Sequence, residues 1–237
     1  MNAPALYLIP APLAQVPVSS VMPEDHIALV RTLSYFVVEE LRTARRYLSA
    51  LGLRPEHLTL EVVNEHTAAT AWHPLLEPLR QGKSMGMLSE AGSPAVADPG
   101  WELIALAHQE GFRVVPLVGP SAIGMALMAS GLNGQHFAFH GYLPVKAALR
   151  DKKIKELEKQ SAITGQTQIF IETPYRNQQL FEALLNGCMP QTRLTLALNI
   201  TDPDAFICTR TLETWKKNRP DFAGTYRKKP CVFLVMA

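Results

Sequence analysis

The sequence predicts an α/β protein built from two domains. Short apolar runs alternate with amphipathic segments along the chain, and several runs are apolar on consecutive residues, as in strands that are covered on both faces. Alternation of this kind favours mostly parallel sheets. The turn Pro116 to Pro120, which holds two prolines and a glycine, forms a natural joint after one apolar run. We therefore expect one α/β domain over 1–117 and a second over 118–237, each with a mostly parallel sheet.

Each expected element follows from a local pattern. The expected strands are the apolar runs Leu6 to Pro10, Tyr35 to Val38, Met85 to Leu88, Val114 to Val118, Gln168 to Ile171, Leu194 to Leu198 and Val232 to Met236. The clearest helical patterns, each with a cap or a breaker at one or both ends, are Trp101 to Glu110, Ser121 to Ser130, Ala147 to Gln160 and Tyr175 to Asn186.

The composition excludes several classes of protein. Hydrophobic residues make up 47% of the 237 residues and charged residues 19%, which is unlike a disordered chain. No apolar stretch approaches the ~20 residues that span a bilayer, so we expect a cytoplasmic protein without a membrane partner. The three cysteines lack a metal-ligand spacing and the even count of a disulfide framework, so they are expected to be reduced structural thiols.

The charge balance alone does not indicate a nucleic-acid-binding protein, because the formal net charge is only +2. Two local basic clusters stand out, and either one also fits a solvated helix face. The first cluster is Arg42, Arg45 and Arg46, and the second is Lys146, Arg150, Lys152, Lys153 and Lys155.

The loop Ser89 to Gly100 has the composition of a ligand-binding loop. Its small residues allow a ligand to approach the backbone closely, its glycines permit unusual dihedral angles, and its prolines stiffen it. Glu90 offers a carboxylate to an amine or a ribose hydroxyl, whereas Asp98 is expected to cap the helix that opens near Trp101. An ordinary turn is the alternative interpretation.

Two further loops follow apolar runs and lead into helices. Val118 to Ala122 opens a helix whose free backbone amides suit polar groups, although Ser121 also fits an ordinary N-cap. In the other loop, Glu172 is favoured by the dipole of the following helix, and Arg176, one turn further on, is placed to pair with it. Ligands of open α/β sheets bind beyond the carboxyl ends of the strands, so these loops are the expected site.

Together these loops resemble, in order and spacing, the tetrapyrrole methylase family of class III S-adenosylmethionine-dependent methyltransferases. Within that family the resemblance is to the branch that methylates a ribose of small-subunit ribosomal RNA. The loop 89–100 is similar to the family's Ser-Asp-Ala-Gly-Thr-Pro followed by Asp-Pro-Gly, with Glu90 for the first aspartate and Ser93 for the threonine. Further similar segments are Val118 to Ala122, Ser130 to Leu132, Gly141 to Lys146 and Glu172 to Arg176.

The resemblance implies two α/β domains with S-adenosyl-L-methionine in the cleft between them, no metal, and a homodimer. Carried over by position, the cofactor-binding residues would be Pro12, Glu90, Ala91, Gly92, Pro94, Val96, Ser121, Ala122, Thr173 and Ile200. His66 is the candidate proton acceptor, because the unperturbed pKa of histidine lies near neutrality. Arg42 and Glu65 are the other catalytic candidates, and they would orient the substrate or brace the loop as an ion pair. A partly buried structural role is the alternative for His66.

The segments that would face the substrate depart from the family pattern. Pro10 to Gln15 stands where the family has Ala-Thr-Pro-Ile-Gly-Asn, and Asn199 to Asp202 stands where it has Glu-Leu-Thr-Lys. The second change replaces a lysine with an aspartate, which opposes the binding of a polyanion. Three functions therefore stay open: 2′-O-methylation of a ribose in ribosomal RNA, methylation of a small molecule, and cofactor binding without methyl transfer.

Overall fold

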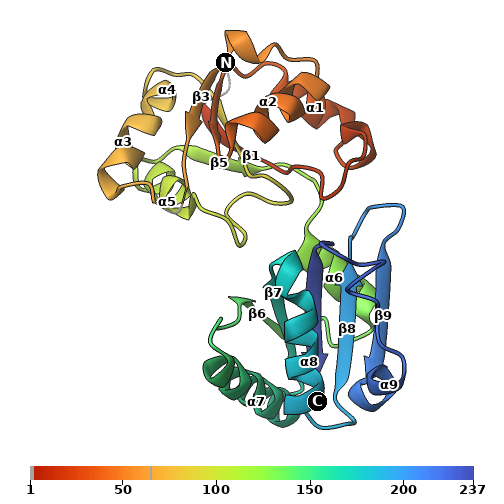
Figure 1. Ribbon diagram of the computed structural model, residues 1–237. Helices are drawn as coiled ribbons and strands as arrows, with labels where there is room; N and C mark the ends of the chain where they lie inside the picture. The colour runs from red at the N-terminus through yellow and green to blue at the C-terminus, as the bar shows by residue number, and fades with distance from the viewer. Residues whose placement is uncertain (1–2, 65) are drawn as a thin grey trace. The chain divides into compact units, whose positions relative to one another are not determined.

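The chain divides into two compact units, Met1–Ser121 and Ala122–Ala237 (Figure 1). The computed structural model describes residues 3–64 and 66–237. The division falls after Ser121, whereas the sequence placed the joint after residue 117. The intervening turn stays with the first unit because the Leu117 amide donates to the Leu8 carbonyl (2.9 Å) and the Pro120 carbonyl accepts from the Ser93 hydroxyl (3.3 Å). None of the described helices is long and apolar enough to cross a membrane.

The first unit contains a five-stranded sheet in the order β3-β2-β4-β1-β5. All of its pairings are parallel, as the sequence predicted. The strands are β1 (Ala5–Ile9), β2 (Tyr35–Val38), β3 (Thr59–Val62), β4 (Met85–Leu88) and β5 (Arg113–Pro116). The α-helices are α1 (Glu24–Val30), α2 (Leu41–Ala50), α3 (Trp72–Leu75), α4 (Glu77–Arg80) and α5 (Trp101–Gln109). Short 3₁₀ helices cover Val18–Ser20, Pro55–His57 and Ala69–Ala71.

Helices cover both faces of this sheet, and the side chains of its strands alternate between two cores. On β2, Phe36 and Val38 pack with residues of α1 and α2, while Val37 packs on the other face with residues of α3, α4 and α5. On β1, Ile9 belongs to the first core and Leu6 to the second. Burying each such side chain contributes about 1.5–3 kcal/mol. The consecutive apolar residues of these strands are explained by this three-layer packing.

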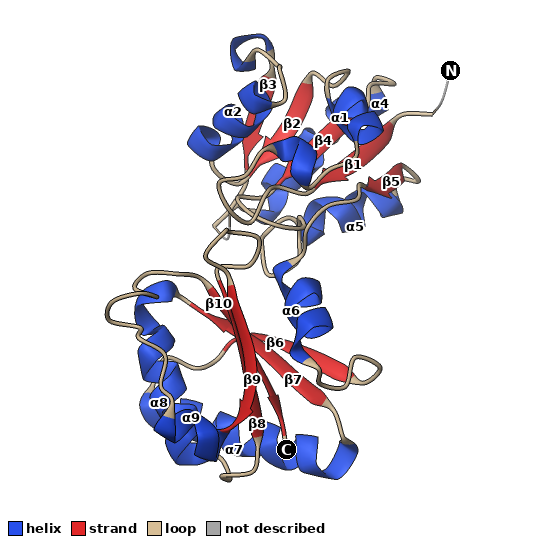
Figure 2. Cartoon of the chain, turned by 90° about the vertical axis from the view of Figure 1, so that its right-hand side faces the viewer, coloured by secondary structure: helices blue, strands red, loops and turns tan. Residues whose placement is uncertain are grey.

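The second unit contains a five-stranded sheet in the order β6-β7-β10-β8-β9. Its strands are β6 (Phe137–Tyr142), β7 (Thr167–Glu172), β8 (Arg193–Leu198), β9 (Phe206–Thr211) and β10 (Cys231–Met236). Its helices are α6 (Ala122–Ser130), α7 (Ala147–Thr164), α8 (Asn177–Gly187), α9 (Leu212–Lys217) and a 3₁₀ turn, Pro174–Arg176. Figure 2 shows α6 on one side of this sheet and α8 and α9 on the other.

The prediction of mostly parallel pairing needs a correction for this second sheet. Only β6 and β7 pair in parallel, whereas β10 runs antiparallel to both β7 and β8, and β8 runs antiparallel to β9. The connection from β8 to β9 has no helix and is too short for a parallel crossover, so these strands form a hairpin. The apolar run of β10 indicated burial on both faces, and such a run contains no information about strand direction.

Candidate functional site

Three loops of the first unit meet at the carboxyl edge of its parallel sheet. They follow β1, β4 and β5 and cover residues 10–15, 89–100 and 117–121. The Ala11 amide donates to the Gly92 carbonyl (2.8 Å), and the Gly92 amide donates to the Ala11 carbonyl (2.9 Å). The Tyr47 hydroxyl of α2 also donates to the Pro10 carbonyl (2.9 Å), and burial raises the pKa of Tyr47. The first two loops are therefore held together by backbone bonds.

Two glycines allow this close approach. A Cβ atom at Gly119 would lie 2.4 Å from the Cβ atom of Pro10, so only glycine fits there. Gly92 has a left-handed φ of 76°, and a Cβ atom on it would lie 3.2 Å from Leu13. The third loop is therefore packed directly against the first.

The loop 89–100 is strained. Ala95 and Ala97 have left-handed φ values of 62° and 66°. For residues other than glycine this conformation costs roughly 1–2 kcal/mol each. Such strain persists where the surroundings impose it, and it clusters at ligand-binding sites. Ordinary turns normally place glycine or asparagine at left-handed positions, so two alanines there favour the interpretation of 89–100 as a binding loop.

Three carboxylates gather beside this loop. The Glu39 Oε2 atom accepts a hydrogen bond from the Glu90 amide (3.1 Å). Burial raises the pKa of Glu39, and the Glu90 carboxylate adds to the rise. The pKa of Asp98 is raised to about 6, mainly by burial and next by the negative charge of Glu39. A carboxylate with that pKa can accept a proton near neutral pH.

The expectation that Asp98 caps the following helix is wrong. The N-cap of α5 is Gly100, with a left-handed φ of 109° and no side-chain cap hydrogen bond. Pro99 and Gly100 separate Asp98 from the first turn, and the carboxylate lies instead within the influence of Glu39 and Glu90. Sequence reasoning missed this acidic group because Glu39 lies far from Asp98 along the chain.

A pocket of about 320 Å³ opens next to Glu90. Its walls come from the loop after β1, from α2 and from the start of the loop after β4, and they include Pro12, Gln15, Arg46, Tyr47 and Glu90. The volume lies in the range of small-ligand pockets. Of the predicted cofactor-binding residues in this unit, Glu90, Ala91 and Val96 are exposed, Pro12 and Ser121 are half-buried, and Gly92 and Pro94 are buried.

Helix α2 begins beside the carboxylates and presents exposed arginines. The Glu40 side chain caps it by accepting from the amides of Arg42 (3.0 Å) and Thr43 (2.7 Å). These bonds lower the pKa of Glu40. Arg42, Arg45 and Arg46 are all exposed, and Arg46 lines the pocket. The first basic cluster is therefore a real surface feature next to the candidate site.

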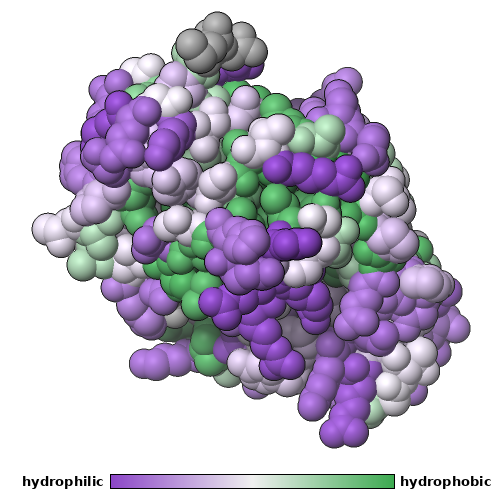
Figure 3. Space-filling model, turned by 90° about the horizontal axis from the view of Figure 1, so that it is seen from above, coloured by the Kyte–Doolittle hydropathy of each residue, from purple (hydrophilic) through white to green (hydrophobic). Residues whose placement is uncertain are grey.

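The second basic cluster does not form a continuous surface. Arg150 is only 7% exposed, and its Nε atom lies 3.6 Å from Asp151 Oδ1. Lys153 lies 4.0 Å from Glu156. On the one face of the molecule that Figure 3 draws, hydrophilic and hydrophobic side chains are interspersed.

Of the remaining catalytic candidates, Glu65 lies outside the described residues. His66 is exposed, and its backbone amide donates to Asn64 Oδ1 (2.9 Å) in a turn that Thr67 closes by accepting from the Asn64 amide (2.8 Å). The alternative interpretation of His66 as a partly buried residue is therefore wrong. This turn follows β3, so His66 stands beyond the carboxyl end of a strand.

In the second unit, Thr173 and Ile200 follow the carboxyl ends of β7 and β8. These strands run in the same direction on either side of β10, so both residues belong to one edge of the sheet. Glu172 Oε1 accepts from the Thr173 amide (2.7 Å) and from Arg176 Nη2 (2.6 Å). The predicted Glu172–Arg176 pair is confirmed. Ala122 opens α6 elsewhere in this unit and is half-buried.

The connection after β8 is also strained. Asn199 and Thr201, which flank the buried Ile200, have left-handed φ values of 53° and 72°. Among the described side chains, the Thr201 Oγ1 and Asn177 Oδ1 atoms are buried without a hydrogen-bond partner. Such atoms need an explanation, and a polar ligand at this edge would supply their partners.

Asp202 stands where the family has a lysine, and the charge of Lys229 offsets the negative charge of Asp202 and its neighbour Asp204. Asp202 Oδ1 accepts from the Asp204 amide (3.3 Å), and Asp204 forms an ion pair with Lys229 (2.8 Å). The Lys229 ammonium lowers the pKa of Asp204 to about 2. Across the part of the chain that the structure describes, no group of three or more His, Cys, Asp and Glu side chains is placed to hold a metal ion.

The chain is similar in sequence to known RNA-modifying enzymes. It is 33% identical over 200 residues to ribosomal RNA small subunit methyltransferase I of Vibrio cholerae, a match covering 84% of this chain and 66% of the relative. It is 32% identical over 209 residues to the protein of the same name from Mesorhizobium japonicum, covering 88% and 68%. The chain thus spans about two thirds of the length of these relatives. No family model matches it.

The fold is similar to solved methyltransferase structures. The methyltransferase CobJ aligns with a TM-score of 0.62 at 17% identity, covering 99% of this chain and 94% of that one. Cobalt precorrin-4 methyltransferase CbiF aligns with a TM-score of 0.62 at 16% identity, covering 98% and 94%. At these identities the likeness concerns the fold, and it confirms the predicted fold class.

Proposed function

The chain belongs to the ribosomal RNA small subunit methyltransferase I family, and from this premise we propose that it methylates a ribose 2′-hydroxyl of small-subunit ribosomal RNA. The family predicted from the loop motifs is thereby confirmed. The observation that carries the proposal is the strained loop 89–100, bonded to the loop after β1 beside an open pocket.

S-adenosyl-L-methionine would be the methyl donor, and the residues present fit it. In the first unit, Pro12, Glu90, Ala91, Gly92, Pro94, Val96 and Ser121 would contribute contacts. There Glu90 offers an exposed carboxylate, and Val96, which is 47% exposed, offers apolar surface. In the second unit, Ala122, Thr173 and Ile200 would contribute, together with the unpartnered Thr201 and Asn177 oxygens. When bound, this cofactor supplies a methyl group on a positively charged sulfur atom.

The protein's own contribution would be to hold the target hydroxyl in line and to take its proton. His66, the candidate from sequence, is one acceptor that would serve, and Asp98, with a pKa of about 6, is a second. Arg42 and Glu65 would orient the substrate, and the exposed Arg45 and Arg46 would contact phosphates. Binding of RNA should then weaken with salt in proportion to the number of phosphates contacted.

The experiment is methyl transfer from radiolabelled S-adenosyl-L-methionine to small ribosomal subunits purified from cells that lack the gene. Label in the ribosomal RNA that depends on an intact loop 89–100 supports the proposal. Label that appears only in a small-molecule fraction would instead establish the second candidate function. Cofactor binding by calorimetry without transfer to any acceptor would indicate a binding protein that no longer reacts.

We also propose that the protein works as a homodimer in the cytoplasm, where its RNA substrate would be. Support comes from α6, whose sequence is apolar around its whole circumference and whose Met128 side chain is 85% exposed. A helix of this kind is normally covered. Sedimentation of the full chain tests the assembly, and a concentration-independent monomer would contradict it.

A further inference from the structure

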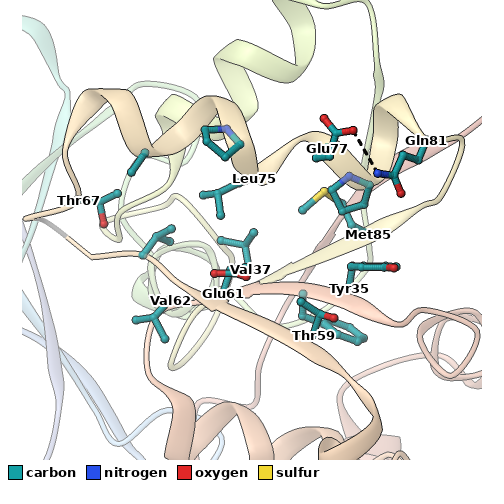
Figure 4. A pocket seen from close by; sticks show the side chains of 15 residues that line it. Tyr35, Val37, Thr59, Glu61, Val62, Thr67, Leu75, Glu77, Gln81 and Met85 are labelled. Carbon is teal, nitrogen blue, oxygen red and sulfur yellow. Dashed lines mark hydrogen bonds between the residues drawn. The ribbon is translucent and has the colours of Figure 1, made fainter.

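The edge strand β3 of the first unit borders a second pocket, of about 580 Å³ (Figure 4). It shares no lining residue with the pocket beside Glu90. Most of its walls are apolar and come from β2, β3, β4 and the α3–α4 segment. In Figure 4, Val37, Glu61 and Leu75 lie in the middle of the group, with Thr67 at one end and Glu77 and Gln81 at the other.

Glu61 is the chemically unusual residue of this pocket. It pairs with Val37 in the parallel register of β2 and β3, so both side chains lie on the face that packs toward α3 and α4. Over the described ranges, the Glu61 carboxylate has neither a hydrogen bond nor an ion pair. Glu77, in contrast, is bonded to Arg80 (3.3 Å) and to Gln81 (3.1 Å). Glu61 is itself exposed, so the pocket offers one unpaired, solvent-accessible carboxylate beside its apolar walls.

The backbone of β3 is open along its outer side, because β3 ends the sheet and pairs only with β2. The Thr59 amide donates to the Ser34 carbonyl (2.9 Å) and the Val63 amide to the Val38 carbonyl (2.9 Å), both toward β2. Backbone groups alternate in direction along a strand, so those of Leu60 and Val62 point outward. Val62 is also 43% exposed. The strand is only four residues long, and Glu61 is its one charged residue.

We propose that β3 and its pocket form a docking site for an extended segment of a protein partner. The segment adds a strand at β3, places a lysine or arginine next to Glu61, and inserts the apolar side chains two positions away into the pocket. Main-chain bonds of this kind supply affinity, and the pockets beside them supply specificity. A basic residue across from a glutamate is the stabilising pair for neighbouring strands. The site is independent of the proposed methyl transfer.

A second copy of the chain is disfavoured as the occupant. Pairing two β3 strands about a twofold axis would bring the Glu61 carboxylates directly or diagonally opposite each other, where like charges repel. RNA is disfavoured for the same reason, because the pocket's only unpaired charge is negative. The competing interpretation is that Glu61 merely guards the edge against pairing with other chains.

The test uses blocked peptides Thr-Val-Thr-X-Thr-Val-Thr, with lysine, glutamine or glutamate at X, and fluorescence anisotropy on the full chain. We expect the lysine peptide to bind about tenfold more tightly than the glutamate peptide, and Glu61→Lys to reverse that order. Val62→Pro removes an outward amide at an edge position that tolerates proline, so it should abolish binding of all three peptides. Glu156→Gln, an exposed carboxylate of α7, is the matched control and should change nothing.

Three results would overturn the docking site. One is that none of the peptides binds, which would mean that Glu61 only prevents other chains from pairing with β3. Another is that Glu61→Lys and the milder Glu61→Gln show the same preference among the three peptides as the unchanged protein. These two variants carry the test if Val62→Pro lowers the stability of the protein. The third is that Val62→Pro alters the sedimentation of the protein alone, because the edge would then join copies of the chain. Methyl transfer is not a readout, so failure of the proposed enzyme activity leaves this test intact.

Discussion

The carboxyl edges of the two sheets are held in different ways. In the first unit the loops are joined by backbone bonds between Ala11 and Gly92 and by the contact of Gly119 with Pro10. In the second unit the edge is braced by charged side chains, Glu172 with Arg176 and Asp204 with Lys229. Parallel strands deliver neighbouring loops to one edge, where backbones can meet. In the second unit β10 lies between β7 and β8, so the loops after these two strands do not begin side by side. There Glu172 and Arg176 brace the single loop after β7, whereas the Asp204–Lys229 ion pair and one backbone bond, from the Asn199 amide to the Pro230 carbonyl (2.9 Å), join the connection after β8 to the segment before β10.

The largest effect is expected from breaking a brace of the second unit. The side chain of Glu172 is 4% exposed and that of Arg176 is 21% exposed, so Arg176→Ala leaves a buried carboxylate without its cation. Loss of a partner in such a pair costs about 3 kcal/mol of unfolding free energy. Urea denaturation measures it. Arg219→Ala, which removes a more exposed ion pair with Glu182, is the control and should cost under about 1 kcal/mol. Equal losses would contradict the comparison.

The backbone contact of the first unit is broken by Gly119→Ala. The new Cβ atom would lie 2.4 Å from Pro10, which forces the first and third loops apart and costs about 2 kcal/mol. Calorimetry should also show weaker binding of S-adenosylhomocysteine. Gly134→Ala is the matched control, because nothing lies within 4 Å of its added Cβ atom. A normal affinity in Gly119→Ala would mean that the packing of these loops does not shape the cofactor site.

These contrasts also explain how much was predictable from the sequence. The strands with apolar runs and the loops after them were found, because burial on both faces and unusual dihedral angles both leave compositional signals. The edge strands β3, β6 and β9 were missed, because their residues are largely exposed or half-buried and lack an apolar run. The pairing of β10 and the meeting of Glu39 with Asp98 depend on contacts distant in sequence, which no local pattern contains.

A smaller effect is expected at the acidic group of the first unit. The raised pKa of Asp98, about 6 against 3.8, means that the folded state disfavours its ionised form. This group therefore adds most to stability below pH ~4, and the contribution is lost as pH rises toward 6. Asp98→Asn should raise stability at pH 7 by about 1 kcal/mol after solvent screening and have no effect at pH 3.5. Thermal unfolding at both pH values checks this, and a gain at pH 3.5 would contradict it.

The smallest effect is expected from relieving strain in the loop 89–100. Ala97 adopts a left-handed φ of 66°, which glycine tolerates without the Cβ clash. The relief is partly offset by the greater entropy of glycine in the unfolded chain, so Ala97→Gly should stabilise the protein by about 0.5 kcal/mol. Ala162→Gly, on an exposed position of helix α7, should instead destabilise it by about 1 kcal/mol. If both substitutions destabilise equally, the loop after β4 stores no strain, and the strongest local difference between a binding loop and an ordinary turn disappears.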